Sequence, residues 1–233
     1  MTNKANARLA GFAFLFYIAT GISSLVLFNQ AAGGGSAAAK LASIVQHAGL
    51  VRVTVLLNLC GFLSAVVLGV TLYALTRDED RELALLGLCC RLTEGVNAVV
   101  AATGRLQLLS LATIATGSTA ATQETVTAQA LGALEFRSGG WTGNISAICF
   151  ALGSTLFAYL FVRSRSIPAP LAWLGLFASL LLLVTLPIGL VGAIDIPFLV
   201  WIPMLVFELA FAVWLIVKGV APAGRRLEPS PAS

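Results

Sequence analysis

The chain has 233 residues, of which 58% are hydrophobic and only 10% are charged. Soluble domains carry about 25% charged residues, so this composition excludes an ordinary soluble protein and indicates a chain that lies mostly in lipid. The net charge of +4 does not indicate nucleic-acid binding, because the basic residues are scattered at the ends of apolar segments. Four cysteines and a single histidine match no metal-ligand spacing, so we predict neither a metal nor a cofactor.

Six apolar segments each reach the about 20 residues that a transmembrane helix needs. They cover residues 9–28, 50–76, 83–113, 141–162, 171–194 and 196–217. The last two lie so close in the chain that they predict a tight helical hairpin, in which Pro187, Pro197 and Pro203 kink or start helices. The first segment is too long for the apolar region of a signal peptide, about 7–15 residues, so we expect it to be retained.

Lysine and arginine predict the orientation in the membrane. With the N-terminus in the cytoplasm, nine of the fourteen basic residues lie on the cytoplasmic side, and an even number of spans returns the C-terminus there. We therefore predict an all-α, polytopic six-helix bundle, N-in and C-in, formed by residues 1–220 as one domain, with a disordered tail at 221–233. Two short amphipathic helices are expected on its outer face, within residues 36–50 and 118–138, the second ending at Gly139–Gly140.

Three charged residues lie at membrane depth in these segments. Arg91 and Glu94 are three residues apart, so they are neighbours on one helix face and can form an ion pair. Glu208 and Glu94 both lie roughly 15–16 Å from the cytoplasmic ends of their segments, at a rise of about 1.5 Å per residue. A charge at the centre of a span costs about 2.5–3.5 kcal/mol on insertion scales, and such residues commonly mark a working site. Which way the sixth segment faces, and so whether the two carboxylates meet, is left open by this pattern.

Three interpretations of these charges are open. In the first, they form a structural network that specifies helix packing. In the second, they line a cavity for a lipid-like or isoprenoid-like molecule; an enzyme would use Glu94 and Glu208 as acid and base, with Arg91 as their electrostatic partner. In the third, they belong to the proton or ion path of a transporter.

Other polar residues are candidates for ligand contacts. Arg52 and Arg105 lie near the outer ends of their spans, where they either extend towards lipid headgroups or hold a phosphate or carboxylate group at the mouth of a cavity. The amides Asn58, Asn97 and Asn144 lie within spans and either bind a ligand or hydrogen-bond between helices.

Four stretches of the chain resemble one bacterial multi-pass membrane family. They are ANARLAGFAFLFYIATGI, CRLTEGVNAVV, YLFVRSRSIPAPLAWLG and IPMLVFELAFAVWLIVKG. The family is catalogued as domain of unknown function 4386, and the resemblance covers nearly the whole chain. It implies the multi-pass fold, an Arg-x-x-Glu element at Arg91 and Glu94, an Asn at Asn97 and a Glu at Glu208, and it implies no reaction. Residues 141–144 depart from the family pattern, because the start of the fourth span is less apolar than expected.

We therefore predict an integral membrane protein of a bacterial inner membrane that binds a lipid-like molecule in an intramembrane cavity. One alternative is a membrane enzyme that acts on an isoprenoid or lipid substrate, such as a cyclase or isomerase. Another alternative is a small transporter or an accessory membrane subunit. The expected partner is the lipid bilayer, and we expect no binding to nucleic acid. Whether the chain forms a homo-oligomer is left open by the sequence.

Overall fold

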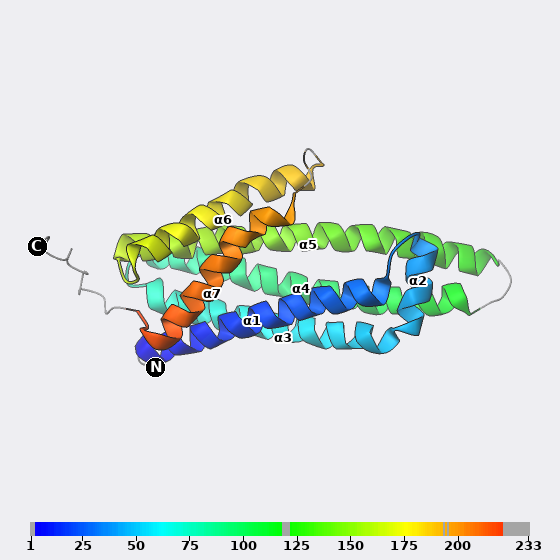
Figure 1. Cartoon of the computed structure of the whole chain (residues 1–233), viewed down its shortest axis with the longest axis horizontal. Coiled ribbons are helices and arrows are strands. Elements are labelled where there is room, and N and C mark those ends of the chain that lie inside the picture. Colours follow the sequence, from blue (N-terminus) through cyan, green and yellow to red (C-terminus); the bar gives the residue numbers. More distant parts are fainter. Residues whose placement is uncertain (1–2, 118–121, 193, 195, 221–233) are drawn as a thin grey trace, which may run out of the picture. The chain divides into compact units, whose positions relative to one another are not determined.

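The computed structural model describes residues 3–117, 122–192, 194 and 196–220, and every regular element in them is helical (Figure 1). In chain order the elements are α1 (Asn3–Ala32), α2 (Ala37–Gln46), α3 (Ala48–Thr76), α4 (Arg81–Thr116), α5 (Gln123–Ser164), α6 (Ala169–Leu190), the 3₁₀ helix η1 (Phe198–Trp201) and α7 (Ile202–Val217). Six helical segments of this described chain, with η1 and α7 counted as one, are long and apolar enough to cross a membrane. The predicted all-α fold with six membrane-spanning helices is therefore confirmed.

Packing divides the described residues into two compact units. The first unit comprises the described parts of Met1–Phe16, Ser64–Glu94 and Ala147–Ser233, and the second comprises those of Tyr17–Leu63 and Gly95–Ser146. The helices α1, α3, α4 and α5 contribute residues to both units. The tail that we predicted to be disordered, residues 221–233, lies outside the described residues.

In the first unit, α6 and α7 form the hairpin predicted for the last two spans (Figure 1). The boundaries differ from the prediction, because α6 ends at Leu190 and α7 begins only at Ile202, after η1. Gly192 has a φ of +76°, a left-handed conformation that ends a helix and that glycine adopts without a steric penalty. Pro197 lacks an amide donor, so it precedes η1 rather than continuing a longer helix.

Aromatic side chains from three helices pack in the core of the first unit. The ring centroid of Phe211, on α7, lies 5.6 Å from that of Phe14 on α1, 5.1 Å from that of Phe161 on α5 and 5.3 Å from that of Phe207. Edge-on and stacked ring pairs at such distances add about 0.5–1.5 kcal/mol each beyond their burial. These contacts set the rotation of α7 about its axis and place Glu208 on its buried face.

In the second unit, α2 is the first of the two predicted amphipathic helices, and it is confirmed. Ser36 caps it, because its hydroxyl accepts a hydrogen bond from the Ala39 amide at 3.3 Å. Leu41 and Ile44, on the apolar side of α2, are fully buried in a cluster with residues from α1, α3 and α4. The apolar side of α2 therefore packs on the protein itself.

The second predicted amphipathic helix is not a separate element, and this part of the prediction is wrong. Its described residues belong to α5, which runs unbroken through Gly139–Gly140. Neither glycine has a positive φ, so both continue the helix at a cost of about 1 kcal/mol each relative to alanine. A long helix satisfies its backbone hydrogen bonds internally, which a break near the membrane does not.

Candidate functional site

Arg91 and Glu94 form a buried ion pair on α4. The distance between Arg91 Nη1 and Glu94 Oε2 is 2.9 Å, and the two side chains are 1% and 5% exposed. Their spacing of three residues places both on one face of the helix. A buried pair of this kind needs good geometry and further contacts to offset the cost of desolvating both charges.

Glu208 brings a second carboxylate from α7 into the same unit. It is 6% exposed and shares the buried face of α7 with Phe207 and Phe211. Phe207, the chain neighbour of Glu208, lines the same cavity as Arg91, so Arg91, Glu94 and Glu208 are grouped here as the Arg91 cluster. Among the residues that the structure describes, no group hydrogen-bonds to Oε1 of Glu208.

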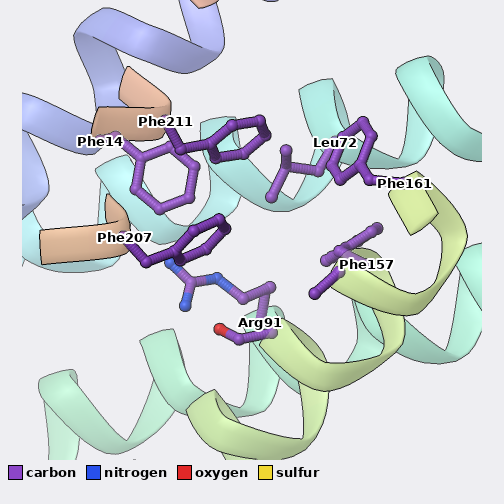
Figure 2. Close-up of a pocket in the computed structure, with 9 residues that line it drawn as sticks. Phe14, Leu72, Arg91, Phe157, Phe161, Phe207 and Phe211 are labelled. Carbon is purple, nitrogen blue, oxygen red and sulfur yellow. The ribbon is translucent and has the colours of Figure 1, made fainter. Parts of the chain in front are cut away.

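Aromatic rings surround the guanidinium of Arg91. Its Cζ atom lies 5.1 Å from the ring centroid of Phe150 on α5, a distance typical of a cation–π contact. Figure 2 shows the guanidinium directed towards the ring of Phe207, with Phe157 beside the aliphatic part of the side chain. The charge of Arg91 is therefore stabilised by π faces as well as by Glu94.

A small cavity adjoins Arg91 (Figure 2). Its lining consists of Phe14, Leu72, Arg91, Ser154, Phe157, Ala158, Phe161, Phe207 and Phe211. Its volume is about 10 Å³, close to the minimum of about 10–15 Å³ that one water molecule needs. Pockets for drug-sized ligands measure about 300–1,000 Å³, so this cavity has room for a water molecule or one small polar group.

A second polar cluster lies in the second unit around Arg105 of α4, and it is named here the Arg105 cluster. Arg105 Nη1 donates hydrogen bonds to Ser24 Oγ (2.6 Å), to the Thr54 carbonyl oxygen (3.2 Å) and to Asn58 Oδ1 (3.4 Å). Ser24 Oγ in turn donates to Asn58 Oδ1 at 2.8 Å. The Arg105 Cζ atom lies 4.6 Å from the ring centroid of Phe28, so an aromatic ring also supports this cation.

The family relationship follows from the sequence as a whole. The chain matches the model of a family described as a domain of unknown function (DUF4386) over residues 9–219, almost its full length. The chain belongs to this family. Neither a search of curated proteins nor a search of solved structures gave a significant match. Membership in DUF4386 agrees with a multi-pass membrane fold, and it assigns no reaction or ligand.

The remaining candidate residues of this DUF4386 protein lie outside both clusters. Arg52, on α3, is exposed and lies about 200° around the helix from Thr54, so it points away from the Arg105 cluster. Asn97 and Asn144 are half-buried in the second unit, and neither hydrogen-bonds to a described residue of the Arg105 cluster. Of the five candidate ligand-contacting residues, namely two arginines and three asparagines, the structure thus brings together only Arg105 and Asn58.

Two glycines of this DUF4386 protein make room for Arg91, and the sequence did not single them out. A Cβ atom added at Gly69 of α3 would lie 3.2 Å from the Cβ of Arg91, and one at Gly153 of α5 would lie 3.5 Å from its Cδ. Both glycines thus let neighbouring helices approach α4 closely. The spacing of Phe150, Gly153 and Phe157 on α5 could have indicated this packing from the sequence. Residues at i, i+3 and i+7 share one face of a helix.

The described residues hold no group of three or more His, Cys, Asp or Glu side chains that could bind a metal ion. The charged groups of the Arg91 cluster in this DUF4386 protein are one guanidinium and two carboxylates. Such a set can bind a polar group by hydrogen bonds and charge, and it can exchange a proton with a bound molecule.

Proposed function

We propose that this protein is an integral membrane protein that binds a lipid-like molecule through the Arg91 cluster, in a bacterial cytoplasmic membrane. The membrane environment is supported by the six apolar helices and by the DUF4386 family. The bacterial location rests on the family resemblance, and the positions of the basic residues support the orientation with both termini in the cytoplasm.

One observation carries the proposal, namely the carboxylate oxygen of Glu208 that lacks a hydrogen-bond partner among the described residues. A buried polar atom without a partner costs about 1–3 kcal/mol. Because a lipid environment offers no bulk water, a donor for this oxygen has to be held inside the protein, either as a water molecule or as a polar group of a bound molecule. A hydroxyl or amine group of an amphiphilic molecule supplies such a donor, and Arg91 would bind an oxygen on the same polar group.

The size of the cavity limits how this molecule would bind. About 10 Å³ beside Arg91 accepts a water molecule or a small polar group but not an acyl or isoprenoid chain. A lipid-like ligand therefore requires α7 to move away from α4, while its apolar part lies along the lipid-facing sides of the helices. Two features favour such a movement: η1 is a 3₁₀ helix of only four residues, and Pro203 in the first turn of α7 has no amide hydrogen to donate.

Mass spectrometry of the molecules that co-purify with the protein tests the proposal. The full chain, Glu208→Leu and a matched control, Glu82→Gln, are purified in the same mild detergent. Glu82 is an exposed carboxylate in the first turn of α4, so its substitution removes a charge far from any buried cluster. We expect a lipid-like species to accompany the wild-type chain and Glu82→Gln, and to fall about tenfold in Glu208→Leu, because one charge-assisted hydrogen bond is worth about 1.5–3 kcal/mol.

Thermal unfolding of the same variants separates this proposal from a purely structural network. Replacement of an unpartnered carboxylate by leucine leaves the melting temperature unchanged or raises it, because the uncompensated polar atom is removed. A structural network predicts instead a clear loss of stability and no change in co-purified molecules. Equal amounts of every lipid-like species in wild type and Glu208→Leu would refute the proposal, whereas a change in the mass of the bound species on incubation would indicate an enzyme.

A further inference from the structure

We infer that the Arg105 cluster is a binding site for a phosphate oxyanion, separate from the Arg91 cluster. Its cation is held by uncharged groups only, namely one hydroxyl, one carbonyl and one side-chain amide oxygen. No carboxylate of the described residues lies within 4.0 Å of Arg105. Glu135 of α5 places its Oε1 against Gly104, the chain neighbour of Arg105, and its Oε2 accepts a hydrogen bond from Ser138 at 3.3 Å, but it forms no ion pair with Arg105.

The unused donors of Arg105 suit such an anion. All three of its hydrogen bonds are made by Nη1, whereas Nε and Nη2 make none within the described residues and are not fully buried. A guanidinium presents two parallel N–H groups that match two oxygens of one phosphate. Because Phe28 covers the guanidinium and the acceptors hold Nη1, the free edge is already oriented for binding.

The level of Arg105 along α4 places it where phosphates of a bilayer lie. Arg105 is 22 residues beyond Leu83, at which we predict the span to begin, and this corresponds to about 33 Å of helix. The hydrocarbon core is about 30 Å thick, so Arg105 lies at the far headgroup boundary. Trp141 of the same unit is 49% exposed and contacts Arg137, a combination typical of residues at the membrane interface.

Native mass spectrometry of the full chain in detergent tests this inference, with phosphatidylglycerol as the added probe. Arg105→Gln is expected to weaken phospholipid binding about tenfold or more, because a bidentate, charge-assisted contact is lost. Ser24→Ala keeps the charge but removes the acceptor at 2.6 Å that orients it, so binding weakens by about two- to tenfold. The control is Arg137→Gln, which removes an exposed arginine of the same unit that also lies over an aromatic ring, and it leaves binding unchanged.

Inorganic phosphate, titrated against the bound phospholipid, distinguishes the two sources of the oxyanion. If inorganic phosphate displaces the lipid, the site binds free phosphate as well as the lipid headgroup. If the lipid stays bound, the site binds the phosphate of the headgroup only. Unchanged binding in Arg105→Gln, or an equal loss in Arg137→Gln, overturns the inference. If Arg105→Gln does not fold, Arg105→Lys retains the charge without the planar pair of donors; weaker binding in that variant supports the site, and unchanged binding overturns it.

Discussion

Removal of the charge of Arg91 is expected to destabilise the first unit strongly. In Arg91→Met, a long apolar side chain occupies much of the same space, but Glu94 and Glu208 remain buried without their cation. Breaking a buried pair in this way costs about 3–5 kcal/mol. For a chain of this length, each kcal/mol corresponds to about 2–4 °C, so the melting temperature should fall by about 6–20 °C.

The geometry explains why this effect exceeds that of a surface pair. At the observed 2.9 Å, Coulomb's law with an effective dielectric constant of about 20 gives an attraction of about 6 kcal/mol before desolvation is subtracted. The cation–π contact with Phe150 adds about 0.5–2 kcal/mol. Arg163 also pairs with a carboxylate at 2.8 Å, but its side chain is 47% exposed, and pairs of that kind contribute about 0–1 kcal/mol.

Thermal unfolding in lipid nanodiscs, followed by tryptophan fluorescence and circular dichroism, measures the effect. Arg163→Met is the matched control, and it should lower the melting temperature only slightly and in a salt-dependent way. The double variant Arg91→Met/Glu94→Gln should lose clearly less stability than the sum of the two single variants, because coupled residues deviate from additivity by about 0.5–3 kcal/mol. Additive losses, or an Arg91→Met variant as stable as the control, would show that the pair does not stabilise the fold.

Four further substitutions probe the packing within the two units. Gly153→Ala should destabilise the protein by about 1–3 kcal/mol, because the added Cβ would lie 3.0 Å from the Cβ of Cys90. Gly143→Ala is the control on the same helix. Because Gly143 has open space around it, this substitution should stabilise the protein by about 0.5–1 kcal/mol. Phe211→Ala removes a ring that contacts three others and should cost about 3–5 kcal/mol in denaturant unfolding. Leu41→Ala should cost about 2–5 kcal/mol and increase proteolysis near α2, because this side chain is fully buried.

Local features of the sequence were sufficient to predict the membrane-spanning helices and the ion pair of Arg91 with Glu94. Apolar length alone identifies a membrane-spanning helix, because the thickness of the hydrocarbon core sets the length that is needed. The ion pair depends only on a spacing of three residues within one helix. Both features follow from helix geometry and need no knowledge of how helices pack.

Features that depend on packing between helices could not be predicted. The rotation of α7, and so the burial of Glu208, follows from the contacts of Phe211 with rings on other helices. The aromatic surroundings of Arg91 and the glycines beside it are likewise visible only once α3, α4 and α5 are brought together. The break predicted at Gly139–Gly140 was wrong because glycine weakens a helix only slightly, whereas an unpaired backbone in lipid costs much more.

The two clusters differ in the sign of the charge that lacks a counterpart, and this difference determines what each would bind. The Arg91 cluster contains one cation and two carboxylates, so the group it lacks is a hydrogen-bond donor. The Arg105 cluster, within the described residues, contains a cation and only neutral acceptors, so the group it lacks is an anion. Because the clusters share no residue and lie in separate packing units, Glu208→Leu and Arg105→Gln should act additively on stability. Their effects on bound molecules should also differ in kind, with loss of a hydroxyl- or amine-bearing species in the first and of phospholipid in the second.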